Sequence, residues 1–335
     1  MQEAMYYTSK KGVVQCTLCP RNCYVQPDKI GFCLVRKNID GKLYSLVYGR
    51  VAGGLAVDPI EKKPLFHFLP GTSVLSFGTV GCNLHCKHCQ NWTTSQVHAG
   101  QAFEKEISPE EIVNTTIDRG CESIAYTYNE PTIFYEFMLD TAKLAKKEGI
   151  KNTMVSNGFI NKSPLKKLCK YMDGVNVDLK GFNNLFYGKI TTAWLQPVLD
   201  TLKTLKKEKI WFEITNLIIP SLNDNMDDIK KMCEWIKNNV GVDHPLHFSA
   251  FHPDFELRNI PSTPVTSLLN AYEIAKGVGL NYVYIGNIIT RDYENTYCPK
   301  CKLLLVERVG FRVLQNNVKN NKCPSCNTKI AGVFR

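Results

Sequence analysis

The sequence predicts an α/β protein built on a full or partial (β/α) barrel, with a cysteine-rich segment before the barrel and a small cysteine-bearing module after it. Two observations lead to this prediction. Apolar stretches alternate with helical patterns through the middle of the chain, and eleven of the fourteen cysteines gather near the two ends and in one loop. Alternating apolar strands and helices form parallel βαβ units. We expect the three parts to span residues 1–70, 71–290 and 291–335.

The first barrel strand is predicted at residues 73–77, which run directly into a loop with three cysteines. Ser108, Pro109 and Glu111 then predict a helix start, because they supply an N-cap, a proline at the first helical position and a capping box. The later elements follow by the same alternation. Strands are expected at 123–128, 153–156, 175–179, 210–215, 246–251 and 282–285, and helices at 132–148, from 163, and at 194–207, 225–239 and 265–276.

Polar residues follow the predicted strands, where barrels of this class carry their chemistry. Polar residues also follow strands as ordinary turn formers, so each one alone is equally well explained by a turn. Together, an aspartate, a lysine, a glutamate and a histidine on one rim predict a site. The rim residues are Asn129, Glu130, Ser156, Asn157, Asp178, Lys180, Thr215, His252 and Asn287.

The composition is that of an ordinary globular protein, with 44% hydrophobic and 21% charged residues. The net charge of +10 is dispersed over lysine-bearing helical patterns such as residues 142–147, which favours solvated faces over a nucleic-acid patch. The apolar runs are far shorter than the roughly 20 residues of a membrane helix. The first residues lack the apolar core of a signal peptide. We therefore expect a cytoplasmic protein without a membrane partner.

Cysteines in a cytoplasmic chain indicate metal ligation rather than disulfides. Near the end of the chain, two C-P-x-C pairs flank a hairpin-like segment at residues 303–313 and predict a structural zinc ribbon. The four cysteines near the start are spaced less regularly, and zinc, a second iron–sulfur cluster or no metal all fit, with zinc slightly preferred. The terminal pairs are Cys298, Cys301, Cys323 and Cys326, and the first group is Cys16, Cys19, Cys23 and Cys33.

The three remaining isolated cysteines, Cys121, Cys169 and Cys233, lie in or beside helical patterns and are expected in the core.

The loop after the first strand holds Cys82, Cys86 and Cys89 in a C-x3-C-x2-C arrangement. This spacing matches neither zinc knuckles nor zinc fingers. Thiolates are the natural ligands of a [4Fe–4S] cluster, and three of them would leave one iron open to another ligand. The alternative is a zinc ion completed by His85 or His88.

This loop, placed after the first strand of a βα barrel, resembles the signature of the radical S-adenosyl-L-methionine (SAM) superfamily. The stretches CTLCPRNC from Cys16, VDPIEKKPL from Val57 and YTYNEPT from Tyr126, with the terminal C-P-x-C pairs, resemble the AmmeMemoRadiSam-system enzymes, relatives of the pyruvate formate-lyase activating enzymes. The resemblance implies a radical SAM barrel whose [4Fe–4S] cluster on the three loop cysteines cleaves SAM reductively. The resulting 5′-deoxyadenosyl radical would abstract hydrogen from a substrate.

The resemblance also assigns roles to rim residues. His88 falls where the superfamily places an aromatic residue against adenine, and Glu130 falls where a Gly-Gly-Glu element meets the SAM amino group. Asp178 and Lys180 match an Asp-x-Lys element whose lysine reaches the SAM carboxylate. His252 matches a late histidine near SAM. The implied partners are a reduced flavodoxin- or ferredoxin-type electron donor and a protein substrate or partner of the AmmeMemoRadiSam system.

Two elements depart from the family pattern. Tyr128 and Asn129 stand where the family has two glycines, which puts the backbone contact to SAM in doubt. Residues 155–158 read Val-Ser-Asn-Gly where the family has Asp-Thr-Asn-Gly, so any monovalent-cation site built on that acid is in doubt as well. Ser156 and Asn157 remain candidate SAM contacts.

Plainer interpretations stay open for several of these residues. Glu130 suits a helix cap, Asp178 and Lys180 suit a rim salt bridge, and residues 58–64 suit either a surface turn or the flank of an active site. For the whole chain, the alternatives are a glycyl-radical-enzyme activating enzyme and a zinc-ribbon protein that binds or modifies RNA. Aromatic residues are not interleaved with basic ones as RNA-stacking platforms would require.

Overall fold

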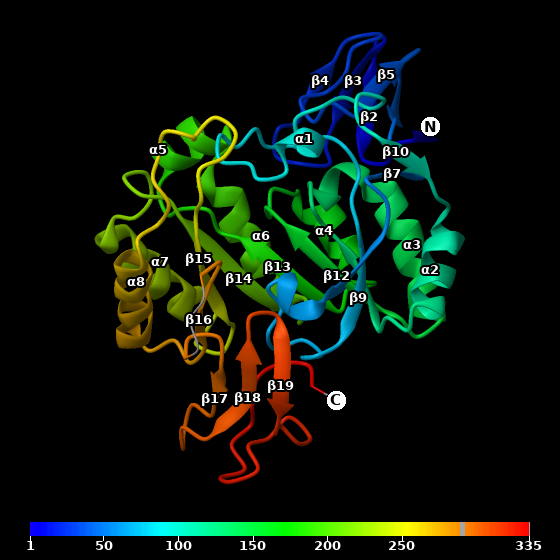
Figure 1. The fold of residues 1–335 in the computed structure, drawn as a ribbon. Coiled ribbons are helices and arrows are strands. Elements are labelled where there is room, and N and C mark those ends of the chain that lie inside the picture. The colour runs from blue at the N-terminus through cyan, green and yellow to red at the C-terminus, as the bar shows by residue number, and fades with distance from the viewer. Residues whose placement is uncertain (289–291, 335) are drawn as a thin grey trace.

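An eight-stranded sheet forms the centre of the molecule, in the spatial order β16-β15-β14-β13-β12-β11-β9-β8 (Figure 1). The computed structural model describes residues 1–288 and 292–334. Strands β9 to β16 of this sheet run parallel, and β8 pairs antiparallel with β9. Within the described chain β8 and β16 form no ladder with each other, so the sheet is an open, partial barrel. The strands are β8 (Ala56–Pro59), β9 (Ser73–Phe77), β11 (Ser123–Tyr126), β12 (Lys151–Ser156), β13 (Gly174–Asp178), β14 (Trp211–Ile218), β15 (Leu246–Ala250) and β16 (Val283–Gly286).

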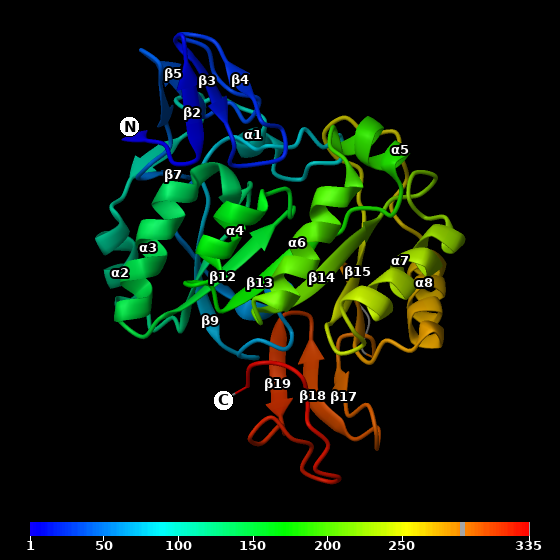
Figure 2. The same cartoon turned by 180° about the vertical axis from the view of Figure 1, so that it is seen from behind.

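The main helices lie over one face of this sheet, as Figure 2 shows from behind. The predicted capping box is confirmed: Glu111 N donates to Ser108 Oγ at 3.1 Å, and Ser108 N donates to Glu111 Oε2 at 2.7 Å. The helices are α1 (Trp92–Ser95), α2 (Pro109–Asp118), α3 (Tyr135–Lys147), α4 (Lys162–Leu168), α5 (Asn184–Phe186), α6 (Leu195–Lys207), α7 (Met226–Asn239) and α8 (Val265–Val278).

Several predicted boundaries were wrong by a few residues. Strand β11 ends at Tyr126 because the chain turns at Tyr128, which has a φ of 72°. A 3-10 turn at Pro131–Phe134 precedes α3, since the proline fixes the first turn and Glu130 caps it. Helix α4 starts after Asn161, so Ser163 lies inside its first turn.

The first part of the chain forms short strands that the sequence analysis did not predict. They make two three-stranded sheets, β1-β6-β5 and β2-β3-β4, while β7 pairs with β10. Strand β8 extends the barrel sheet into the segment predicted as N-terminal. The additional strands are β1 (Gln2–Glu3), β2 (Tyr7–Lys10), β3 (Val13–Cys16), β4 (Tyr24–Val25), β5 (Arg36–Ile39), β6 (Lys42–Ser45), β7 (Arg50–Ala52) and β10 (Glu104–Glu106).

A buried ion pair fastens this N-terminal segment to the barrel. Arg36 Nη2 donates to both carboxylate oxygens of Glu136 on α3, at 2.6 and 2.5 Å, and the two side chains are 2% and 4% exposed. Met5 N donates to the same carboxylate at 2.7 Å. The Glu136 carboxylate therefore links the N-terminal segment to helix α3.

The C-terminal module is a three-stranded antiparallel sheet of β17 (Thr296–Tyr297), β18 (Leu304–Val309) and β19 (Arg312–Asn316). Figure 1 shows it at the opposite end of the molecule from the N-terminal strands. The hairpin predicted at 303–313 corresponds to β18 and the first part of β19. The predicted boundary between 290 and 291 lies outside the described residues.

Buried polar side chains anchor this module under the barrel. His67 Nδ1 lies 2.7 Å from Ala331 O, which can only accept, so this nitrogen carries the proton. His67 Nε2 then accepts from the Tyr284 hydroxyl on β16 at 2.6 Å. Glu213 on β14 accepts from the backbone N–H of His67 at 2.7 Å. One neutral imidazole thus ties the end of the chain to the sheet.

Acid is expected to weaken this anchor. Burial lowers the pKa of His67 from its ordinary value of 6.5 to about 4, although the Glu213 carboxylate opposes the shift. Between these pH values His67 is protonated in the unfolded chain but neutral in the folded chain. The free energy of unfolding therefore falls as the pH drops from 6.5 towards 4. The loss attributable to this one group approaches about 1.4 kcal/mol per pH unit.

Urea unfolding at a series of pH values measures this dependence. His67→Gln should flatten the slope between pH 6.5 and 4, whereas the exposed control His98→Gln should leave it unchanged. Equal slopes in the wild type and the His67 variant would contradict the assignment.

Candidate active site

One cavity of about 640 Å³ brings together most of the predicted site residues at the carboxyl ends of the strands. Ser156 lies outside its lining and bonds to Glu130. His252 is exposed and is also outside the lining, because β15 ends at Ala250 and the chain then runs outward. The predicted residues on the wall are Cys82, Cys86, His88, Cys89, Asn129, Glu130, Asn157, Asp178, Lys180, Thr215 and Asn287.

The three loop cysteines open onto this cavity from the segment that follows β9. Cys82 Sγ lies 3.4 Å from Leu84 N and 3.8 Å from Asn157 Nδ2, and Cys89 Sγ lies 3.0 Å from Ser95 Oγ. Burial raises the pKa of Cys86 to about 12, and that of Cys82 is raised by burial and by the Glu130 carboxylate. Thiolates at this place therefore need the positive charge of a bound metal group.

His88 lines the cavity, and both of its ring nitrogens are buried. Its ring is buried, and within residues 1–288 and 292–334 neither Nδ1 nor Nε2 has a hydrogen-bond partner. Burial, with a smaller effect of Lys180, lowers the pKa of His88 to about 3, so the ring is neutral. Buried polar atoms are normally paired. The two orphan nitrogens therefore fit a polar ligand of the cavity.

His85 points to a different neighbour. Its ring stacks on Phe32 of the N-terminal segment at a centroid distance of 4.1 Å, and it is absent from the described lining of the cavity. The alternative of a zinc ion completed by His85 therefore gains no support from the geometry.

Glu130 is both a helix cap and a brace for the next strand end. Its Oε1 accepts from Thr132 N at 3.0 Å, from Thr132 Oγ1 at 2.6 Å and from Ser156 Oγ at 2.8 Å. Its Oε2 accepts from Asn157 N at 2.8 Å. Burial raises the pKa of Glu130, while these bonds oppose the shift. The capping interpretation is confirmed, and the same carboxylate reaches the cavity wall.

Asp178 and Lys180 form the predicted rim salt bridge, with Lys180 Nζ 2.8 Å from Asp178 Oδ2. Burial favours the neutral amine, but Asp178 and the Cys86 sulfur outweigh it and raise the pKa of Lys180. A charged ammonium therefore stays beside the loop cysteines, where it can meet an anionic group of a ligand.

Asn129 holds the loop in place. Its Nδ2 donates to Thr79 Oγ1 at 3.0 Å and to Gly81 O at 2.9 Å, and its Oδ1 accepts from Thr79 N at 3.2 Å. This side chain ties the end of β11 to the segment that leads into Cys82.

The far wall of the cavity contains residues outside the predicted site. Lys62 and Lys63 lie on it and donate to the two oxygens of Asp58, at 2.9 and 2.6 Å. The Tyr128 hydroxyl donates to the same carboxylate at 2.9 Å. Residues 58–64 therefore flank the site rather than form a surface turn. Phe311, in the turn between β18 and β19, also lines the cavity, and no sequence signal pointed to it.

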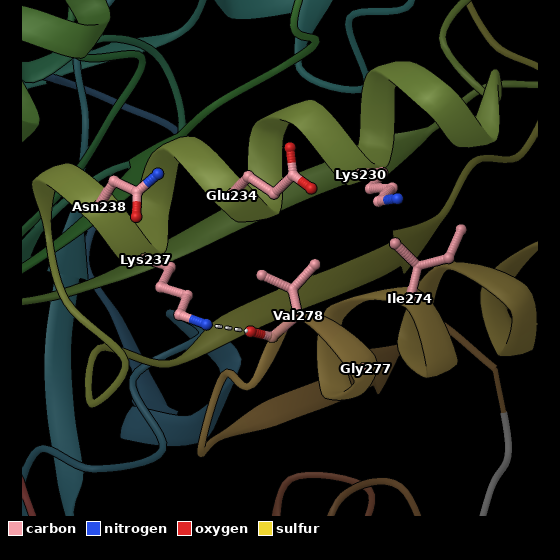
Figure 3. A pocket seen from close by; sticks show the side chains of 7 residues that line it. All are labelled: Lys230, Glu234, Lys237, Asn238, Ile274, Gly277 and Val278. Atoms are coloured by element: carbon pink, nitrogen blue, oxygen red, sulfur yellow. Dashed lines mark hydrogen bonds between the residues drawn. The ribbon is translucent and has the colours of Figure 1, made fainter.

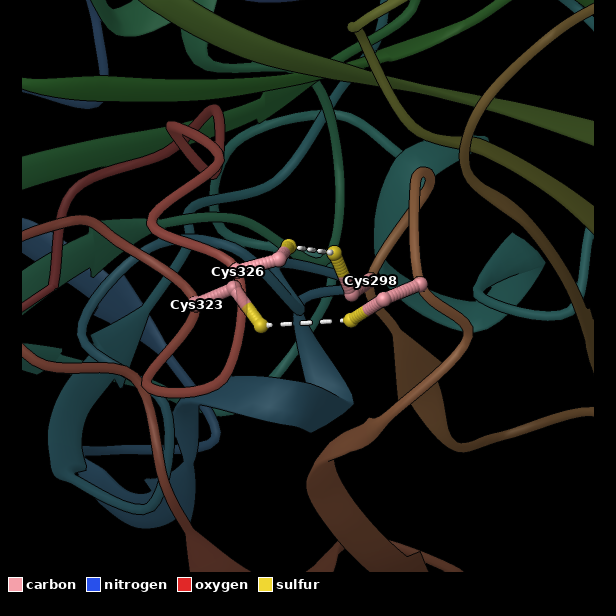
Figure 4. Close-up of side chains that lie close together, drawn as sticks. Cys298, Cys323 and Cys326 are labelled. Carbon is pink, nitrogen blue, oxygen red and sulfur yellow. Dashed lines mark hydrogen bonds between the residues drawn. The ribbon is translucent and has the colours of Figure 1, made fainter.

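The four C-terminal cysteines converge as a metal site would require. Cys298 and Cys326 Sγ lie 3.6 Å apart, as do Cys301 and Cys323 Sγ, and all four sulfurs lie within 4.8 Å of one another (Figure 4). These separations fit a tetrahedral ion with metal–sulfur bonds of about 2.3 Å.

A separate groove lies on the outer helical layer, between α7 and α8 (Figure 3). Lys237 Nζ crosses it and donates to Val278 O at 2.8 Å. Lys230, Glu234 and Asn238 line the α7 side. Its lining contains neither cysteine nor histidine, and we assign it no part in the chemistry.

The site and fold agree with the comparisons to known proteins. Residues 77–236 match the profile of the radical SAM superfamily, and this range contains the three-cysteine loop. The chain therefore contains a radical SAM domain. Its family includes the uncharacterized protein MJ0808 of Methanocaldococcus jannaschii, which is 47% identical over 333 residues, 98% of this chain and 99% of that protein.

More distant relatives share parts of the chain. The pyruvate formate-lyase-activating enzyme of Clostridium pasteurianum is 27% identical over 198 residues, which cover 54% of this chain and 80% of that enzyme. The crystal structure of Streptococcus suis SuiB aligns with a TM-score of 0.52 at 14% identity, over 68% of this chain and 52% of that one. This likeness shows the fold alone. In the described residues no helix is long and apolar enough to cross a membrane.

Proposed function

We propose that this enzyme holds a [4Fe–4S] cluster on Cys82, Cys86 and Cys89, binds SAM in the adjoining cavity and uses it to start a radical reaction. When bound, the cluster supplies one electron that cleaves SAM into methionine and a 5′-deoxyadenosyl radical, which takes hydrogen from the substrate. The observation that supports this most is that one cavity is lined by three thiols, a charged lysine and a histidine, and that this histidine has no hydrogen-bond partner in the described part of the chain.

The remaining wall residues would orient SAM and shield it. Lys180 offers an ammonium to the SAM carboxylate, and Asp178 fixes that ammonium in place. His88 offers a neutral ring to the adenosyl moiety, and its two nitrogens have no hydrogen-bond partner among the described residues. Glu130 acts through Asn157, whose backbone and side chain it positions beside Cys82. The buried part of the wall, which includes His88 and Glu130, would limit the access of water to a reactive radical.

The deciding experiment uses protein purified without oxygen and reconstituted with iron and sulfide. Dithionite and SAM are added, and 5′-deoxyadenosine is measured by chromatography. We expect the wild type to produce it and the Cys82→Ala/Cys86→Ala/Cys89→Ala variant to produce none. Cys121→Ala, a cysteine outside the three groups, should retain production. Wild-type protein with full iron and sulfide content that yields no 5′-deoxyadenosine would contradict the proposal.

Lys180→Met is expected to weaken SAM binding about tenfold, because it removes one charge-assisted hydrogen bond. Equilibrium binding of SAM to the reconstituted protein measures the effect. Lys189→Met, at an exposed position close by, is the matched control and should bind normally. Unchanged affinity in the Lys180 variant would remove this residue from the SAM site.

We propose a protein as the substrate, a partner belonging to the AmmeMemoRadiSam system, with activation of a glycyl-radical enzyme as the alternative. The similarity to pyruvate formate-lyase-activating enzymes supports a protein substrate. The extra modules on both sides of residues 77–236 support a target different from theirs. Hydrogen–deuterium transfer from a labelled candidate protein into 5′-deoxyadenosine distinguishes the two.

We also propose zinc as the ion at the C-terminal cysteines, with the module as a zinc ribbon. The short sulfur–sulfur distances support this assignment. The electron donor we propose is a reduced flavodoxin or ferredoxin. Fourteen free cysteines fit a reducing compartment, and we propose the cytoplasm. Elemental analysis of Cys298→Ala beside the wild type tests the zinc assignment, with loss of one zinc per chain expected.

A further inference from the structure

The cysteines of the N-terminal segment form a third sulfur-rich site, distinct from the loop and the C-terminal module. Cys16 ends β3, and the turn that follows carries the next two cysteines before β4 begins at Tyr24. The fourth lies on the turn before β5. All four line one cavity, whose other walls are mostly apolar; the sulfur ligands are Cys16, Cys19, Cys23 and Cys33.

The spread of these sulfur atoms argues against a single ion. In the described chain only the C-terminal group brings its ligand atoms within 4.8 Å of one another. The N-terminal four are thus more widely spaced than a tetrahedral zinc would hold them. The loop cysteines share this wider spacing. A polynuclear iron–sulfur cluster, whose thiolates bind separate iron atoms, fits such a spread better than one ion.

Two cations border the N-terminal site, which suits the net negative charge of a thiolate-bound cluster. Arg36 and Arg21 both line the cavity. Arg36 is already paired with Glu136, whereas the Arg21 guanidinium lies 3.4 Å above the Phe32 ring and, within residues 1–288 and 292–334, donates only to neutral oxygen atoms.

The N-terminal site is packed directly against the loop cysteines. Arg21 Nε donates to Asn83 O at 2.6 Å, one residue beyond Cys82. The Cys33 carbonyl lies so close to Gly81 that an added Cβ would sit 2.4 Å from its oxygen. Asn83 lines the N-terminal cavity, and its side chain accepts from Asn157 Nδ2 at 2.8 Å. Two cysteine sites with one shared wall are suited to exchange of an electron.

We infer that Cys16, Cys19, Cys23 and Cys33 hold a second [4Fe–4S] cluster, through which an electron enters the enzyme on its way to the loop cysteines. A reduced flavodoxin- or ferredoxin-type donor loses one electron to this site, and the same electron then moves to the loop without any transfer of atoms. The inference that these cysteines hold a cluster depends only on the geometry of the N-terminal site. The inference that this cluster is an electron port rests on the proposed function.

The first test counts clusters without requiring SAM cleavage. Full-length protein is reconstituted anaerobically, and iron, sulfide and zinc are measured beside electron paramagnetic resonance spectra of the dithionite-reduced protein. We expect about eight iron atoms per wild-type chain and about four in the Cys82→Ala/Cys86→Ala/Cys89→Ala variant. The electron paramagnetic resonance signal that remains in that variant should not change when SAM is added, since four thiolates leave no iron open.

Adding Cys19→Ser and Cys23→Ser to that variant should remove the remaining iron. This result would exclude the C-terminal cysteines as the ligands of that iron. Zinc without iron in the loop variant would overturn the inference. If the variants fail to fold, Mössbauer spectra of the wild type decide: two clusters, of which SAM perturbs one, are expected. A single SAM-sensitive cluster would overturn the inference.

The second test addresses the electron port. Freeze-quenched samples follow reduction of the loop cluster by a limiting amount of reduced flavodoxin, and the Cys19→Ser/Cys23→Ser variant should be reduced several-fold more slowly than the wild type. Cys121→Ser is the control and should match the wild type. An unchanged rate would overturn the port. This outcome is separate from a failure of the proposed function, in which the wild type would make no 5′-deoxyadenosine.

Discussion

Replacing Glu136 by alanine is expected to lower the free energy of unfolding by about 3–5 kcal/mol. The variant leaves the Arg36 guanidinium buried at 2% exposure without its carboxylate and leaves Met5 N without its acceptor. Because the whole stability of a domain is about 5–15 kcal/mol, this single change removes a large share of it. Urea unfolding, followed by circular dichroism, measures the loss.

The control for this prediction is the residue that caps the same helix at its C-terminus. Glu148→Ala, at the exposed end of α3, should change stability by less than about 0.5 kcal/mol. Arg36→Met combined with Glu136→Leu should recover most of the loss, since no charge is then left buried. A loss below about 1 kcal/mol in Glu136→Ala would mean that water reaches Arg36, contrary to its burial.

Gly81→Ala is expected to damage both neighbouring cysteine sites. Gly81 has a φ of +84°, which costs an alanine about 1–2 kcal/mol. Its Cβ would lie 2.4 Å from Cys33 O and 2.7 Å from Val35 Cγ1, so the N-terminal turn must move, at a further cost of about 1–3 kcal/mol. We expect a clear loss of stability and a lower iron content after reconstitution.

Gly54→Ala separates the effect of backbone strain from the effect of steric overlap with the N-terminal turn. Gly54 has a φ of +92°, and an added Cβ would meet no atom within 4 Å, so it reports backbone strain alone. Urea unfolding and iron analysis of both variants should show the larger loss for Gly81→Ala and normal iron for Gly54→Ala. Equal stability and equal iron in the two variants would contradict the close packing of the cysteine sites.

The barrel was predictable because its signals are local. Alternating apolar runs and a capping box at Ser108 act over a few residues, and the structure reproduces them with shifts of a few positions. The positions of the loop cysteines and of the Asp178–Lys180 pair were equally predictable, since their spacing from the strands alone brings them to the strand ends. The open sheet itself was one of two forms that the alternation allowed.

The N-terminal strands were not predictable because their partners are distant in sequence. Strand β7 spans three residues and pairs with β10 more than fifty positions later. The Lys63 side chain is 2% exposed, but no periodic pattern in the sequence indicates this burial. The buried ammonium is stabilised by Asp58 and by the Tyr128 ring. His252 shows the opposite error: a strand end placed it on the rim, while the chain direction after Ala250 carries it outward.

Phe311 gives the C-terminal hairpin a second consequence. It lies in the turn of a hairpin whose other end is next to the four C-terminal cysteines, yet it also lines the cavity onto which the loop cysteines open. The shape of this cavity is therefore set partly by the C-terminal module. We expect that exchanging this module between related proteins would change the cavity while leaving the loop cysteines in place, so the two features can vary independently.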